Sequence, residues 1–127
     1  MHPLVVLGVP VGPNGCTVCW YCTSDGTCQA RTYLEAIPGK FKAQIAARVR
    51  QLAITGQIRG RIGHRLDPPF SDIWELTPDG HRFFVFQERR TFYITNGAKK
   101  EPGKRKQRRD YERATQLRKD FYSRRSN

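Results

Sequence analysis

Apolar residues gather in three short runs in the second half of the chain, at residues 73–76, 82–87 and 91–95. Turn-forming residues separate these runs, with Pro-Asp-Gly at 78–80 and Glu-Arg-Arg at 88–90. Short runs of strand-forming residues bounded by such turns are typical of antiparallel strands. The pattern therefore predicts three antiparallel strands joined by two tight turns.

The middle run carries apolar side chains on both faces of the predicted sheet. Successive side chains of a strand point to opposite faces, so Arg82, Phe84 and Phe86 share one face. Phe83 and Val85 share the other face. Because both faces are partly apolar, we expect other elements to cover each of them in part.

Three further segments show helical periodicity. The first spans residues 29–37 and is broken by Pro38, the second ends at Gly56, and the third begins near Lys106. Each carries an apolar stripe that we expect to pack on the sheet. The stripes consist, in chain order, of Ala30, Tyr33, Leu34 and Ile37; Phe41, Ile45, Val49 and Leu52; and Tyr111, Ala114, Leu117 and Phe121.

Residues 17–22 favour one more strand, and residues 57–71, rich in Gly, Arg and Pro, favour a loop. The predicted order is β-α-α-β-β-β-α, an α+β fold with a small antiparallel sheet, an N-terminal helical hairpin and a C-terminal helix. Residues 1–15 form a predicted N-terminal extension, either a loose arm, an edge strand or a segment translated from an upstream start codon. The domain is predicted over residues 16–122, and residues 123–127 form a basic tail.

The chain is strongly basic and its charge is unevenly distributed. The net charge is +12, and residues 99–127 contribute 12 Lys and Arg against four Asp and Glu. A bare charge run is usually a solvated tail, but positive charge beside patterned elements is the footprint of a nucleic-acid-binding surface. The apolar start at residues 4–11 is too short to cross a membrane and lacks the features of a signal peptide, so we expect a cytoplasmic protein with no membrane partner.

Several motifs recur in a defined order between about residue 19 and residue 122. They are RTYLE at 31–35, LAITG at 52–56, WEL at 74–76, PDGHR at 78–82, GAKK at 97–100 and a helical segment at 111–122. In this order, over about four-fifths of the chain, they resemble the RelE/HigB superfamily of toxins from bacterial toxin–antitoxin operons. The resemblance is to its phage-related HigB-like branch in particular.

The resemblance implies a RelE-like fold and a metal-independent endoribonuclease that cleaves mRNA, usually on the ribosome, without a cofactor. It also implies neutralisation by a cognate antitoxin, commonly a helix-turn-helix protein. In such a reaction the 2′-OH of the substrate attacks the adjacent phosphate and leaves a 2′,3′-cyclic phosphate. The protein has to align the attack, transfer protons and stabilise the charge that develops on the phosphate.

Five residues are candidates for this chemistry. Arg82 starts a strand after a tight turn, can hold two phosphate oxygens, and matches the strand arginine that is functional in the toxin family. Lys99 and Lys100 end the last strand, where crowding among cations could make one of them a usable base. His81 could shuttle a proton, and Glu75 could be a general base if it shares a face with Arg82. We expect the cations to converge at one edge of the sheet.

Structural roles for the same side chains stay open. Arg82 could form an ion pair with Glu75 or Asp79, and the two lysines could be a solvated strand end. Thr77 stands where many relatives carry Arg after the Glu-Leu pair, so one familiar cation is absent. Residues 101–104 read EPGK, which departs from the family's usual run of Thr and a further Lys.

A second set of basic residues is expected to hold RNA phosphates without reading base sequence. His64 and Arg65 lie in the predicted loop before the sheet, where relatives often carry basic contacts to RNA. Tyr111 could stack on a base, but its place on the apolar stripe favours core packing. The other predicted contacts, at the start of the last helix, are Lys104, Arg105, Arg108 and Arg109.

Four cysteines, Cys16, Cys19, Cys22 and Cys28, lie within 13 residues, which invites a zinc or iron–sulfur interpretation. Their spacing matches neither paired zinc knuckles nor the usual bacterial iron–sulfur run. Cys19 and Cys22 would also point to opposite faces of a regular strand. We therefore predict no metal, with a site made of these four residues as the alternative.

Three other functions stay open on sequence alone. A non-catalytic RNA- or ribosome-binding module needs the basic surface but no proton-transfer group. A ParE-like gyrase inhibitor, of related structure, would damage DNA instead of depleting mRNA. A toxin fold without activity is the third, and Thr77 is compatible with it.

Overall fold

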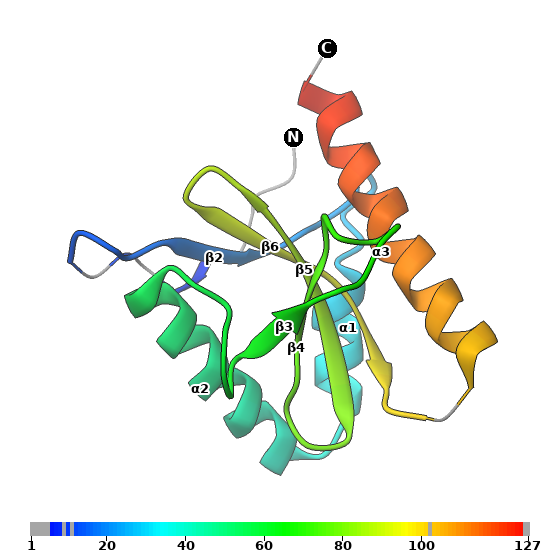
Figure 1. Ribbon diagram of the computed structural model, residues 1–127, viewed down its shortest axis with the longest axis horizontal. Helices are drawn as coiled ribbons and strands as arrows, with labels where there is room; N and C mark the ends of the chain where they lie inside the picture. The colour runs from blue at the N-terminus through cyan, green and yellow to red at the C-terminus, as the bar shows by residue number, and fades with distance from the viewer. Residues whose placement is uncertain (1–5, 9, 11, 102, 126–127) are drawn as a thin grey trace.

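The computed structural model describes residues 6–8, 10, 12–101 and 103–125. Six strands form one sheet in the order β1-β2-β6-β5-β4-β3. With α1 and α2 on one face of this sheet and α3 on the other, the fold is a three-layer α+β domain (Figure 1). The strands are β1 (Val6–Gly8), β2 (Thr17–Trp20), β3 (Gly63–Arg65), β4 (Trp74–Leu76), β5 (His81–Glu88) and β6 (Thr91–Lys99). The helices are α1 (Gln29–Ala36), α2 (Gly39–Thr55) and α3 (Lys104–Arg125).

The sheet is mixed, so the prediction of a purely antiparallel sheet is wrong. β2 runs parallel to β6, whereas the other neighbouring strands are antiparallel. β2 and β6 are far apart in sequence, and the chain between them crosses one face of the sheet through α1 and α2. Parallel neighbours require a long crossover connection of this kind.

β3 lies within residues 57–71, where the sequence predicts a loop. It pairs antiparallel with β4 and places Gly63 opposite Leu76. A Cβ atom at Gly63 would lie 1.9 Å from the carbonyl oxygen of Glu75. Only glycine permits this close approach of two backbones. The strand therefore depends on a residue type that sequence patterns associate with loops.

The chain ends also differ in part from their prediction. β1 pairs antiparallel with β2, so the described part of the N-terminal extension includes an edge strand. Residues 1–5, 9 and 11 of that extension lie outside the described residues. α3 continues through Arg125 into the predicted tail, of which residues 126–127 lie outside the described residues. None of the helices in the described part of the chain is long and apolar enough to cross a membrane.

The core has one part on each face of the sheet, as the two-faced pattern of β5 predicts. Phe83 and Val85 pack in the cluster formed with α1 and α2. Phe84 and Phe86 pack in the cluster formed with α3, together with Leu117. Burial of large apolar side chains on both faces stabilises the central strands and fixes which way β5 faces.

Two glycines with positive φ lie where the sequence predicts a turn and a helix end. Gly80 has φ +75°, and the N–H of His81 donates a hydrogen bond to the carbonyl of Pro78 at 3.3 Å. This closes the tight turn that leads into β5. Gly56 has φ +70° and donates to the carbonyl of Leu52 at 2.8 Å, which caps α2.

Candidate functional site

Three polar side chains from three adjacent strands share the face of the sheet that α3 covers. His64 of β3 is paired with Glu75 of β4, which is in turn paired with Phe84 of β5. Directly paired residues of antiparallel strands share a face, and residues two apart on one strand do so as well. Arg82 therefore lies on the same face as Phe84, Glu75 and His64.

The three side chains form a connected group with Tyr111 of α3. Nη1 of Arg82 lies 3.5 Å from Oε1 of Glu75, and Nε2 of His64 lies 4.0 Å from Oε2 of Glu75. The same Nη1 donates a hydrogen bond to the hydroxyl of Tyr111 at 3.4 Å. The side chain of Glu75 is 4% exposed and that of Arg82 14%, whereas that of His64 is 58% exposed. The group therefore runs from a buried acid–base pair to the surface.

Burial dominates the electrostatics of Glu75. It raises the pKa of this carboxyl, and the positive charges of Arg82, His64 and Lys100 oppose the rise only in part. Among the described residues, neither Nε of Arg82 nor Oε1 of Glu75 has a hydrogen-bond partner. Buried polar atoms of this kind are rare in folded proteins and need an explanation. A ligand that bonds to both groups would supply one.

A hollow of about 380 Å³ lies next to this group, between β3, the loop that follows it and the start of α3. We call it the basic hollow. His64 and Tyr111 border both the buried pair and the hollow, so the two are continuous. Other residues that line it are Arg65, Leu66, Asp67, Pro68, Pro69, Phe70, Lys104, Gln107 and Arg108, so its cations outnumber its one acidic residue, Asp67.

Tyr111 packs in the core and also reaches the buried pair. Its ring packs edge-on against Phe84, with centroids 5.6 Å apart, and is tilted against Phe70 at 5.4 Å. The predicted core packing of Tyr111 is therefore confirmed. Its hydroxyl nevertheless reaches Arg82. Sequence reasoning missed Phe70, although an aromatic residue directly after a Pro-Pro pair in a Gly- and Arg-rich loop is an available signal.

Apart from His64, the predicted RNA contacts divide into three groups. Lys104 and Arg108 line the basic hollow, and the guanidinium of Arg108 lies 6.0 Å from the centre of the Phe70 ring. Arg105 and Arg109 are exposed and do not line it. Arg65 borders the hollow, but its guanidinium lies over the ring of Trp74, 4.8 Å from its centre, and its Nε donates to the carbonyl of Ser71.

Lys100 and Lys99 lie on different faces of the sheet. Lys99 pairs with His81, so both lie on the face covered by α1 and α2. Lys100 follows on the other face, and its charge opposes the burial-driven rise in the pKa of Glu75. The prediction that both lysines converge with Arg82 is therefore wrong for Lys99, and a shared site of Arg82 and Lys100 stays a prediction.

His81 is likewise separated from the buried pair, contrary to its predicted place in the same site. It is 8% exposed, its Nδ1 lies 2.6 Å from the hydroxyl of Tyr33, and its ring packs edge-on against Phe41. The physical reason is the strand alternation that places Arg82 on the opposite face. His64 is the imidazole that lies beside Glu75 instead.

Replacing His81 should change how stability depends on pH. Burial and, to a lesser extent, Lys99 lower the pKa of His81 from its ordinary value of 6.5. The stability that comes from neutral His81 is therefore present above that value and is lost as the pH falls through the folded-state pKa. In urea unfolding between about pH 5 and pH 8, the free energy of unfolding of the wild type minus that of His81→Gln should rise with pH, because this difference removes the contributions of the other titrating groups. A difference that does not change with pH would contradict this account.

The four cysteines do not lie around one point. Cys22 and Cys28 form a disulfide, and Cys16 donates to the carbonyl of Leu52 at 3.1 Å. Cys16 and Cys22 belong to the cluster under α1 and α2, and Cys19 to the cluster under α3. The prediction that Cys19 and Cys22 lie on opposite faces of the sheet is confirmed. Among the described residues, no group of three or more His, Cys, Asp and Glu side chains is placed to hold a metal ion.

The disulfide should stabilise the fold by a modest amount. Linking residues six apart restricts a short loop of the unfolded chain, which corresponds to about 2 kcal/mol in the chain-entropy account. We expect Cys22→Ser/Cys28→Ser to lower the free energy of unfolding by about this amount, measured with denaturant. A reductant should lower the stability of the wild type equally and leave that of the variant unchanged. A variant as stable as the oxidised wild type would refute the estimate.

Comparisons with known proteins give a weak structural similarity. No protein-family model matches the sequence, and no curated protein matches it either. Among solved structures, the chain is similar to a chain of the toxin–antitoxin complex RelBE2 from Mycobacterium tuberculosis, with a TM-score of 0.47 and 17% sequence identity. The match covers 58% of this chain and 85% of that chain.

Proposed function

We propose that this protein is the toxin of a toxin–antitoxin pair and a metal-independent endoribonuclease that cleaves mRNA on the ribosome. The observation that carries the proposal is the buried pair of Arg82 and Glu75, which opens through His64 and Tyr111 onto the basic hollow. A guanidinium beside a carboxyl of raised pKa supplies a phosphate anchor and a candidate base within one site. RNA offers the matching groups, a phosphate and a neighbouring 2′-OH.

The residues of this face can be assigned to the steps of 2′-OH attack. Glu75 accepts the proton of the 2′-OH while the O2′–P bond forms, and a raised pKa makes this carboxylate a stronger base. Arg82 holds two phosphate oxygens, and Lys100 adds a second positive charge. His64 donates a proton to the 5′ oxygen as the P–O5′ bond breaks, which leaves a 2′,3′-cyclic phosphate and a 5′-OH. His64 thereby takes the proton-shuttle role that the sequence assigned to His81.

The basic hollow would hold the nucleotides next to the cleaved bond. Lys104 and Arg108 line it and can contact phosphates. Phe70 and Tyr111 offer aromatic surface on which a base can stack. Arg105 and Arg109, exposed on the same helix, would extend the electrostatic contact beyond the hollow.

The remaining parts of the proposal follow from the toxin role. The protein would act in the cytoplasm, where translating ribosomes supply the mRNA. A cognate antitoxin, a helix-turn-helix protein in the HigB-like branch, would neutralise it. The positive net charge of +12 suits both an RNA substrate and an acidic protein partner.

A non-catalytic RNA- or ribosome-binding module is the second candidate. One observation favours it: Arg82 is only 14% exposed and is already paired with Glu75. In this alternative the pair stabilises the sheet, and the surface cations Lys104 and Arg108 bind RNA without cleaving it.

Incubation of the purified protein with translating ribosomes separates the two functions. The endoribonuclease should produce mRNA fragments that end in a 2′,3′-cyclic phosphate, and EDTA should not prevent their formation. A non-catalytic module should co-sediment with ribosomes or RNA and leave the mRNA intact. Fragments that end in a 5′-phosphate and require a divalent cation would refute the proposed chemistry.

A further inference from the structure

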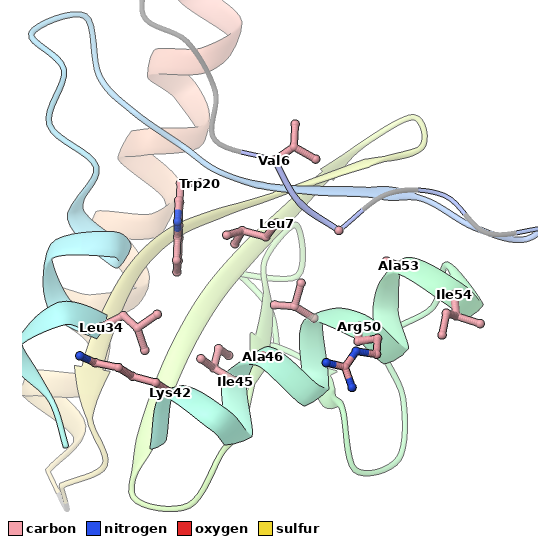
Figure 2. Close-up of a pocket in the computed structure, with 12 residues that line it drawn as sticks. Val6, Leu7, Trp20, Leu34, Lys42, Ile45, Ala46, Arg50, Ala53 and Ile54 are labelled. Carbon is pink, nitrogen blue, oxygen red and sulfur yellow. The ribbon is translucent and has the colours of Figure 1, made fainter. Parts of the chain in front are cut away.

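An apolar groove lies on the face of the molecule opposite the Arg82–Glu75 pair. It is about 550 Å³ in volume and is bordered by α2, by Leu34 of α1 and by Leu7 of β1. Figure 2 shows α2 along one side of the groove, with Leu34 and Leu7 facing it from the other elements. Neither the buried pair nor the basic hollow contributes a residue to it.

The groove exposes apolar surface that the fold itself does not cover. Ile54 at one end of α2 is 46% exposed and Val6 of β1 is 53% exposed, and both line the groove. Among the described residues, these two are the large apolar side chains that are exposed to solvent. Exposed apolar side chains that line a groove with a polar rim are a common feature of interaction sites.

The rim of the groove is positively charged. Lys42 and Arg50 line it, and Nζ of Lys42 donates to the backbone carbonyl of Glu35 at 3.5 Å. α1 and α2 together contain one acidic residue, Glu35. Arg31 already forms an ion pair with it at 3.1 Å. An occupant that places carboxylates at the rim would therefore meet complementary charge.

We propose that this groove binds an amphipathic α-helix of a partner protein, with an apolar stripe flanked by Asp and Glu. From Lys42 to Ile54, α2 extends over about 18 Å at 1.5 Å per residue. A partner helix of about three turns can lie along this length and place apolar side chains at i, i+3 or i+4, and i+7 into the groove. Identifying the partner as the antitoxin rests on the proposed function, whereas the chemistry of the groove does not.

Two other occupants fit less well. A strand added at this edge of the sheet would find three residues of β1 to pair with in the described part of the chain. A second copy of this chain would bring a net charge of +12 against a rim that is already cationic. The negatively charged amphipathic helix satisfies both the apolar lining and the charge of the rim.

Selection from a displayed library of helical peptides tests the proposal and does not require the partner to be identified first. The library should vary both the apolar stripe and the flanking charge, and the full-length protein should be the target. We expect the enriched peptides to combine an apolar i, i+3/i+4, i+7 stripe with acidic flanks. No enrichment, or enrichment of basic or purely polar peptides, would overturn the proposal.

A matched pair of variants locates the binding. Ala46 and Ala47 are adjacent, exposed residues of α2, but only Ala46 lines the groove. Ala46→Glu should weaken binding of the enriched peptides about tenfold or more, because a carboxylate then enters the apolar contact. Ala47→Glu makes the same chemical change to the same helix and should leave the affinity unchanged. Equal effects of the two variants would overturn the assignment to this groove.

A charge exchange tests the rim separately. Lys42→Glu/Arg50→Glu should reverse the preference, so that peptides with the same apolar stripe and lysine flanks bind more tightly than acidic ones. An unchanged preference would overturn the charge assignment. Self-association that Ala46→Glu abolishes and Ala47→Glu does not would show that a second copy occupies the groove and would also overturn the proposal. The cleavage assay with ribosomes is independent of these variants, so failure of one proposal is distinguishable from failure of the other.

Discussion

Replacing Arg82 with alanine is expected to slow mRNA cleavage about a hundred- to a thousandfold and to abolish growth arrest. Arg82 is the cation that lies beside Glu75 and also reaches Tyr111, so its loss removes the anchor for the phosphate. The fold should survive the change. Burial already raises the pKa of Glu75, and this carboxyl can take up a proton when its positive partner is lost. Single-turnover cleavage on ribosomes, with circular dichroism of the same preparations, would measure both effects.

A matched control is available on α3. Arg109→Ala removes the same positive charge from an exposed position that does not line the basic hollow. It should weaken RNA binding slightly and leave the single-turnover rate nearly unchanged. Arg82→Lys keeps the charge but cannot hold two phosphate oxygens in the same planar geometry, so its rate should fall between those of the wild type and Arg82→Ala. An Arg82→Ala protein that is folded and cleaves mRNA at the wild-type rate would reject the assignment of Arg82.

The central strands and the turns could be predicted because their signals are local. The Pro-Asp-Gly segment at residues 78–80 defines a turn whatever surrounds it, and the apolar residues of β5 on both faces require cover on both sides. β3 gave no such signal, because three residues that begin with Gly63 show no periodicity. The parallel pairing of β2 with β6 depends on contacts between residues that are far apart in sequence, which no local pattern contains.

Lys99 and Lys100 lie on different faces of the sheet because the pairing of β5 with β6 is irregular. The pairing of β5 with β6 shifts register between Phe84 and Val85, whose partners are Asn96 and Ile94. Thr95 is the extra residue, and its hydroxyl donates to the carbonyl of Phe84 at 3.1 Å. A bulge of this kind reverses which face the following residues occupy.

Strict alternation along β6 would put Lys99 on the face of Tyr93, which α3 covers. With the bulge, Ala98 takes that face and Lys99 lies on the opposite one. The sequence could therefore show that one of two adjacent lysines reaches the Arg82 side, but not which. It could not place Arg82 and Glu75 on the same face, because that requires the register of β4 against β5.

Glu75→Gln is expected to separate catalysis from stability. If Glu75 is the general base, the amide cannot accept the proton, and the cleavage rate should fall about a hundredfold or more. The effect on stability should have the opposite sign. Burial raises the pKa of Glu75 above its ordinary value of 4.5, so the folded state binds this proton more tightly than the unfolded chain does. The wild type therefore loses stability as the pH rises from that value through the raised pKa, and a neutral side chain avoids the loss.

Urea unfolding of the wild type and Glu75→Gln, from about pH 4 to pH 8, measures this difference alongside the cleavage rate. The variant should be at least as stable as the wild type at the upper end of the range, and its advantage should disappear as the pH falls. If Glu75 has no part in the reaction, the variant should keep its effect on ribosomes. A loss of stability at neutral pH would show that the pair with Arg82 outweighs the burial of the carboxylate. The two measurements on one variant thus decide whether Glu75 and Arg82, 3.5 Å apart, act in the reaction or only hold β4 to β5.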